Sequence, residues 1–134
     1  MANALYPKFK QALLNKEHNL DTDSIIVNLV DLADYSYSAT HTAAADVAAA
    51  ARVSTSSALG STTITDGAFD STDFSFTAVS GDQSEALILW NDTTTTPTVD
   101  ALVAFYDTGM TGMPVTPNGG DINVTVHTSG WFAL

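Results

Sequence analysis

The sequence contains no cysteine and very few basic residues. Its 134 residues include four Lys and Arg against 15 Asp and Glu, which gives a formal net charge of −11 at pH 7. Without cysteine, a disulfide framework and a thiolate site are both excluded. Nucleic acids and anionic membranes are bound through clustered Lys and Arg, so this charge balance argues against both as partners.

Long apolar runs and catalytic signatures are also missing. No run approaches the roughly 20 apolar residues of a membrane helix, and the N-terminal segment has no apolar core typical of a signal peptide. We therefore expect a protein that is made in a cytoplasm. The sequence has neither a G-x-S-x-G motif nor a glycine series of the phosphate-loop type. We expect no enzymatic activity, no cofactor and no bound metal.

The composition favours a single domain whose surface contacts other proteins. Hydrophobic residues make up 45% of the chain and charged residues only 14%. This is enough apolar material for one core in a chain of this length, but it leaves few charges to cover the surface. Thr and Ser fill many of the polar positions, which suits β-strands and protein contacts.

The first segment has the pattern of a short amphipathic helix over Ala4–Glu17, which we expect to form a helical arm within residues 1–20. Its apolar stripe consists of three residues at helical spacing: Leu5, Phe9 and Leu13. Pro7 fits in a first turn, and Asn3 is a suitable N-cap. So short a helix needs a packing partner, so we expect the stripe to dock on an apolar surface.

The remaining sequence predicts antiparallel β structure. The expected strands span residues 24–31, 52–59, 74–79, 85–91, 99–106, 122–127 and 130–134. The run at 24–31 is almost continuously apolar, as in a strand buried on both faces. Asp66-Gly67 predicts a hairpin turn, and the Ala-rich stretch 42–50 a short helix or turn. The fold class is therefore mainly β: one antiparallel β-sandwich domain over residues 1–134, with a short N-terminal helix.

Two further features of this pattern concern assembly. Residues 84–91 and 98–106 are expected to pair as a central hairpin through residues 92–97. The loop 110–120 is long and nearly uncharged, and its candidate contact residues are Met110, Met113 and Val115. With so few charges to cover every face, the chain is predicted to be a homo-oligomer, either a trimer or a dimer, with this loop reaching the partner.

The triplet Asp107-Thr108-Gly109 follows an apolar strand, as the catalytic triplet of aspartic proteases does. That chemistry needs two carboxylates that share a proton, which a dimer would supply by symmetry. The triplet is equally a common turn sequence, in which Asp caps the turn and Gly permits its backbone. The structural turn is the stronger interpretation.

Other candidate sites are weaker. Acidic residues that could gather calcium lack the EF-hand spacing: Asp21, Asp23, Asp66, Asp70 and Asp73. The three histidines, which lack zinc-site spacing, are expected at the surface: His18, His41 and His127. Aromatic residues that would form a sugar-binding platform are more often core: Trp90, Trp131, Phe105, Tyr106, Phe74 and Phe76. Two tyrosines have the pattern of an exposed interface pair: Tyr35 and Tyr37. Two sequons begin at Asn91 and Asn123, and we expect no glycan on either.

Four stretches of the chain resemble small structural proteins of tailed bacteriophages: MANALYPKFKQALL, TITDGAFD, FTAVSGDQSEALILW and MPVTPNGGDINVTV. The resemblance runs over nearly the whole chain and includes no catalytic signature. It implies a virion component and not an enzyme.

The first expectation from this resemblance is a capsid decoration, or cement, protein that binds the major capsid protein and stabilises the head shell. The second is a tail or head-to-tail component, such as a neck, adaptor or fibre protein. A carbohydrate-binding module on a fibre is the third.

Overall fold

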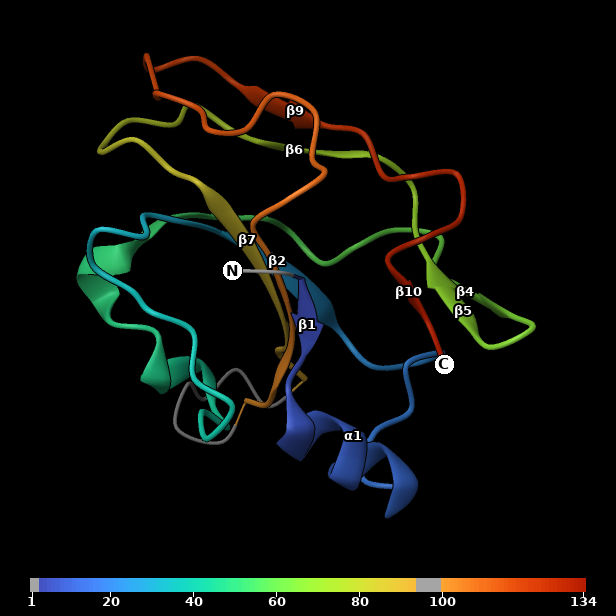
Figure 1. The fold of residues 1–134 in the computed structure, drawn as a ribbon. Coiled ribbons are helices and arrows are strands. Elements are labelled where there is room, and N and C mark those ends of the chain that lie inside the picture. Colours follow the sequence, from blue (N-terminus) through green and yellow to red (C-terminus); the bar gives the residue numbers. More distant parts are fainter. Residues whose placement is uncertain (1–2, 94–99) are drawn as a thin grey trace.

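The computed structural model describes residues 3–93 and 100–134 and has a mainly antiparallel β fold (Figure 1). Its largest sheet contains five strands in the order β1-β8-β7-β2-β3. Their bounds are Ala4–Leu5 (β1), Leu102–Tyr106 (β8), Ala86–Asn91 (β7), Ile25–Val30 (β2) and Arg52–Thr55 (β3). Every pairing in this sheet is antiparallel.

Two smaller sheets complete the described β structure. One has the strand order β10-β5-β4, and the other pairs β6 with β9. Their bounds are Thr63–Thr65 (β4), Ala68–Asp70 (β5), Phe74–Phe76 (β6), Ile122–Val124 (β9) and Phe132–Ala133 (β10). The helix α1 spans Pro7–Leu14, and two 3₁₀ helices lie between β2 and β3, η1 at Ala44–Asp46 and η2 at Ala49–Ala51. The predicted fold class, an antiparallel β-sandwich with a short N-terminal helix, is thereby confirmed.

The centre of the large sheet is buried on both faces. All six residues of β2 and all six of β7 are buried, as are the first four residues of β8. The prediction of a doubly buried strand at 24–31 is correct. The predicted antiparallel pairing of 84–91 with 98–106 is confirmed by the β7–β8 register, while residues 94–97 of the predicted connector and the first two residues of the predicted second strand lie outside the described part of the chain.

One face of the large sheet is covered by the segment that links β2 to β3. The rings of Tyr35 and Tyr37 lie 6.3 and 5.3 Å from the ring of Phe105 on β8. The carboxylate of Asp46 accepts the N–H groups of Ala43 and Thr42, which lowers the pKa of Asp46. The short helix or turn predicted at 42–50 is present as two 3₁₀ turns, and an isolated β-bridge of Ala43 with Ala101 joins this segment to the start of β8.

The opposite face is covered by the two small sheets. Tyr106 is the next residue after Phe105 on β8, so its side chain points to this second face. There its ring lies 5.6 Å from Trp131, and the Tyr106 hydroxyl donates to the Trp131 carbonyl at 2.6 Å. Phe69 of β5 stacks on Phe132 of β10 at 5.5 Å. The arrangement is therefore a sandwich, with the large sheet between the β2–β3 connection and the small sheets.

Asp66-Gly67 forms the predicted hairpin turn, between β4 and β5. Both residues have positive φ, 51° and 82°, as a two-residue turn of the type favoured by Asp-Gly requires. The C-terminal residue lies beside this turn, because the Leu134 N–H donates to the Gly67 carbonyl at 3.0 Å. The neighbouring strand also needs Gly130, since a Cβ there would lie 2.5 Å from the Phe69 carbonyl oxygen.

The N-terminal helix is shorter than predicted, and its first residues form a strand instead. Ala4 and Leu5 pair with β8, and Tyr6 is extended, with φ −66° and ψ 132°. The reason is Pro7, since a residue before proline avoids the helical conformation, so the helix can begin only at Pro7. Asn3 is therefore not the N-cap.

The helix also ends earlier than the predicted Glu17. Lys16 has a positive φ of 65°, and its N–H donates to the Leu13 carbonyl. The N–H of Glu17 donates to the Ala12 carbonyl at 2.9 Å. These two bonds form a Schellman motif, which ends many helices. The position that Lys16 occupies in this motif is usually a glycine.

Residues 3–20 are part of the domain and do not extend from it as an arm. Tyr6 is fully buried and Phe9 is 1% exposed. The Phe9 ring packs edge-on against Phe132 at 6.0 Å and lies 5.4 Å from His18. The predicted apolar stripe thus docks within its own chain at Phe9, whereas Leu14, next to the stripe, is 86% exposed.

These positions predict opposite results for two truncations on α1. Phe9→Ala should lower the free energy of unfolding by about 3–5 kcal/mol, because it leaves a cavity between the helix and β10. Leu14→Ala should change it by less than about 0.5 kcal/mol. Urea unfolding followed by circular dichroism measures both. Equal losses in the two variants would contradict the assignment of Phe9 to the core.

Candidate functional site

A groove of about 570 Å³ lies between the loop that follows β8 and the strand β9. One wall is formed by residues 108–113 and the other by residues 122–128. Asn3, Leu87, Tyr106, Gly130 and Trp131 complete the lining. Figure 1 shows the orange loop after β8 passing close to β9. We call this feature the β9 groove.

The lining of the β9 groove contains no Asp, Glu, Lys or Arg. This is unusual in a chain whose sequence has 15 acidic residues. Its half-exposed apolar side chains come from both walls and from the floor: Met110, Met113, Ile122, Val124, Val126, Tyr106 and Trp131. An exposed apolar surface that is rimmed by polar residues commonly marks a binding site.

The structure separates the six residues that the sequence suggested for an interface. Met110 and Met113 line the β9 groove. Val115 pairs with Ser84 in an isolated β-bridge outside that groove. Leu5 and Leu13 are half-buried against the core, and Phe9 lies inside it. Sequence patterning identified part of the groove but missed the wall formed by β9, whose alternating residues look like those of an ordinary half-buried strand.

The triplet at 107–109 is held as a turn by Asn3. The Asn3 Oδ1 atom accepts hydrogen bonds from the N–H groups of Asp107 and Thr108, at 2.9 and 3.1 Å, and from the Thr108 hydroxyl at 3.1 Å. Its Nδ2 group donates to the Thr108 carbonyl at 3.0 Å. The arrangement is a side-chain-capped turn at the rim of the β9 groove, in agreement with the stronger of the two interpretations of the triplet.

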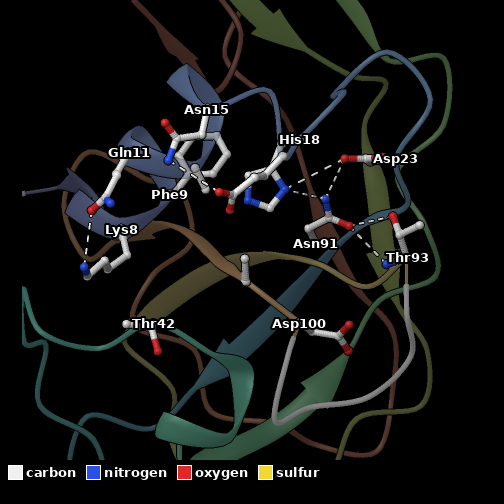
Figure 2. Close-up of a pocket in the computed structure, with 13 residues that line it drawn as sticks. Lys8, Phe9, Gln11, Asn15, His18, Asp23, Thr42, Asn91, Thr93 and Asp100 are labelled. Atoms are coloured by element: carbon white, nitrogen blue, oxygen red, sulfur yellow. Dashed lines mark hydrogen bonds and ion pairs between the residues drawn. The ribbon is translucent and has the colours of Figure 1, made fainter.

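A second cavity, of about 450 Å³, lies under α1 (Figure 2). Its polar cluster is organised by Asn91, which is 6% exposed. The Asn91 Oδ1 atom accepts the N–H and hydroxyl of Thr93, at 3.0 and 2.6 Å, and its Nδ2 group donates to Asp23 Oδ2 at 2.7 Å. This cluster ties the segment after α1 to the end of β7.

The same amide fixes the tautomer of His18. Because a main-chain N–H can only donate, the atom of Asn91 that faces Thr93 is the oxygen and the other is the nitrogen. The Asn91 Nδ2 group lies 3.0 Å from His18 Nδ1, so Nδ1 accepts and the imidazole carries its proton on Nε2. His18 was expected at the surface, but its side chain is only 9% exposed. Near the cavity, burial and the adjacent Asp100 raise the pKa of Asp92.

Three of the five acidic residues considered for calcium have separate structural roles. Asp23 bonds to Asn91, Asp70 caps the N–H of Ser71, and Asp73 accepts the N–H of Val126. Among the described residues, three carboxylates do approach within 4.8 Å of one another: Asp31, Asp34 and Asp82. Sequence spacing gave no signal for this group, because Asp82 comes from a distant turn.

The aromatic residues considered for a sugar-binding platform divide into a buried group and a half-buried group. Trp90, Phe105 and Phe76 are buried in the core. Trp131, Tyr106 and Phe74 are half-buried and adjacent, with Trp131 5.6 Å from Tyr106 and 6.0 Å from Phe74. The two tryptophans therefore do not share an exposed face, which the platform of a carbohydrate-binding module would require.

The expected exposure of Tyr35 is wrong. Its side chain is 5% exposed, and its hydroxyl lies 2.8 Å from that of Tyr6 and 2.9 Å from His41 Nδ1. Burial raises the pKa of both the Tyr6 and the Tyr35 hydroxyls. Tyr37 is half-buried against Tyr6. The alternating DYSYS pattern gave no indication that the Tyr35 hydroxyl would bond to other side chains in place of water.

Comparisons with known proteins identify no family. A scan against protein-family models finds no match to the chain, and a search of curated proteins finds none either.

Within residues 3–93 and 100–134, no helix has the length and apolar character needed to cross a membrane.

The Asn3 cap predicts a local effect at the groove rim. Asn3→Ala removes three acceptor contacts, so it should destabilise the 107–109 turn by about 1 kcal/mol, as loss of a capping side chain does elsewhere. Hydrogen exchange at the Thr108 amide should become faster, while exchange in β2 and β7 stays unchanged. Asn3→Asp keeps the acceptor oxygen and is the matched control. Slower or unaltered exchange in Asn3→Ala would contradict the capping role.

Proposed function

We propose that the chain is a structural component of a bacteriophage virion, specifically a capsid decoration protein that binds the major capsid protein and stabilises the head shell. It would be made in the host cytoplasm and then incorporated into the particle. The resemblance of the sequence to small structural proteins of tailed phages supports this assignment to the virion.

The β9 groove is the observation that carries the proposal. An uncharged, partly exposed apolar groove on an otherwise acidic chain has the chemistry of a protein contact. On a shell the same contact is repeated at every symmetry-related position, so many modest interfaces together give a stable coat. The alternative location, in the tail or at the head-to-tail joint, uses the same chemistry at fewer positions.

We also propose that the protein has no enzymatic activity and assembles as a trimer or dimer. The capped turn at 107–109 supports the first statement, because Asn3 engages the main chain of the triplet. The second is supported by the low charge content and by the exposed apolar residues Ile64 and Leu14, which lie outside the groove. Each subunit contact should bury more than about 1,000 Å² in total.

The location is tested by immunogold labelling of purified phage particles with antibodies against the chain. Gold on the heads is the expected result, together with loss of the genome at lower temperature from particles that lack the chain. Gold confined to tails would replace the decoration assignment with the tail alternative. Particles with no label and no peptide of this chain by mass spectrometry would contradict the virion proposal altogether.

The assembly state is tested by light scattering on the purified chain. We expect a mass of two or three times 14.0 kDa at micromolar concentration. The double variant Ile64→Asp plus Leu14→Asp should lower that mass if these residues lie at subunit contacts. A monomeric mass at every concentration up to about 100 μM, well above typical oligomer dissociation constants, would contradict the oligomer.

A further inference from the structure

The β9 groove runs along one edge of β9. Every residue from 122 to 128 lines it, whereas no residue of β6, the strand that pairs with β9, does so. β6 and β9 form a sheet of only two strands in the described structure. The groove therefore follows the side of β9 that β6 leaves uncovered.

A hydrogen bond just beyond the end of β9 indicates the direction of its main chain. The Val126 N–H donates to the Asp73 carboxylate at 2.8 Å, and Asp73 directly precedes β6. The main chain of Val126 therefore faces β6, and that of Ile122 and Val124 on β9 faces the same way because main-chain groups alternate sides along a strand.

The odd-numbered residues face the other way, because main-chain groups alternate sides along an antiparallel strand. Asn123 of β9, and Thr125 one residue beyond its end, therefore direct their N–H and carbonyl groups away from β6. Outside the pairing of β6 with β9, no main-chain hydrogen bond among the described residues involves either of them. An open strand edge of this kind is a template for a further strand.

Four of the polar side chains that line the groove are already engaged. The Trp131 Nε1–H donates to Ser71 Oγ at 2.8 Å, and the Tyr106 hydroxyl donates to the Trp131 carbonyl. Asn3 is engaged by the turn at 107–109, and Asn123 Oδ1 accepts from the Ser75 hydroxyl. A sugar requires free donors and acceptors beside an exposed ring, and the polar groups of the two aromatic residues of the groove, Trp131 and Tyr106, are both occupied. What the groove offers beside these rings is a main-chain edge and apolar side chains.

We propose that the β9 groove binds an extended, uncharged segment of a partner protein, which adds as a strand alongside β9. The segment pairs its main chain with Asn123 and Thr125 and places an apolar side chain at every second position against the groove walls. Met110 and Met113 form the adaptable wall, because unbranched thioether side chains adjust to irregular partners. Naming the major capsid protein as the source of the segment rests on the proposed function, whereas recognition of such a segment does not.

A random peptide library tests this recognition without any assumption about the virion. The immobilised chain should enrich peptides with alternating apolar residues and few charges. Titration of the enriched peptide into the labelled chain should slow amide hydrogen exchange at Asn123 and Thr125. Exchange in β2 and β7 is the internal reference.

Two variants separate strand pairing from general apolar binding. Thr125→Pro removes the N–H that faces the groove, at an edge position where proline is tolerated, and should weaken peptide binding about tenfold or more. Thr125→Ala keeps that N–H, so it should bind the peptide more tightly than Thr125→Pro does. Met110→Asp places a charge in the apolar wall and leaves the strand edge unchanged, and it should abolish peptide binding. Ile64→Asp, a similar change on β4, should have no effect on peptide binding. Circular dichroism confirms that each variant is folded.

The proposal would be overturned if the library gave no enrichment over the Met110→Asp chain, or if it enriched charged peptides. Normal peptide binding by folded Thr125→Pro would also overturn it. So would protection of the same amides by a neutral oligosaccharide or by self-association of the chain. If particles contain no copy of the chain but the library result is as expected, the virion assignment fails and the groove assignment stands. If the chain decorates heads but Thr125→Pro binds them normally, the virion assignment stands and the groove assignment fails.

Discussion

Burial of both faces of β2, β7 and β8 is the constraint on which the rest of the fold depends. A sheet whose central strands carry apolar side chains on both faces is stable in water only if other parts of the chain cover each face. Each buried Leu, Ile or Val contributes on the order of 1.5–3 kcal/mol, so leaving a face open would remove most of the driving force for folding. The β2–β3 connection covers one face and the small sheets cover the other, while α1 reaches the second layer through the contact of Phe9 with Phe132.

The covering layers are thin, and this has a functional consequence. The sheet of β6 and β9 has only two strands in the described structure, too few to close on itself. It covers the large sheet but leaves the edge of β9 open above the residues that follow β8. The groove thus results from the way in which the core is closed, and Leu87 and Tyr106 of the large sheet are part of its lining.

Much of this fold could be predicted from the sequence, because its central strands are continuous apolar runs and its hairpin turn at Asp66-Gly67 has specific local chemistry. The N-terminal segment could not, since Leu5, Phe9 and Leu13 satisfy a helical period even though Leu5 belongs to a strand. There a local restriction at Pro7 overrides the periodicity. Tyr35 was placed wrongly because its burial depends on a hydroxyl partner, Tyr6, that is distant in the sequence.

The candidate site was predictable only in part. Met110 and Met113 were found because a long uncharged loop with two methionines is conspicuous in an acidic chain. The other wall of the groove depends on which edge of β9 is unpaired, and that is a property of tertiary topology. The same limit applies to Asn3, whose pattern suggested a helix cap but whose side chain instead caps a turn more than 100 residues further along the chain.

The placement of the two tryptophans gives the molecule two optical probes in different surroundings. Trp90 is 4% exposed within the large sheet, with the Arg52 guanidinium 5.9 Å from its ring, whereas Trp131 lies half-exposed in the groove wall. Indole emission shifts to shorter wavelength as water is removed, so the two residues contribute separable components to the fluorescence of the native protein. With Trp90 replaced by Phe, the remaining signal would come from the groove alone. Its wavelength would then follow the hydration of that surface in real time, without an attached dye.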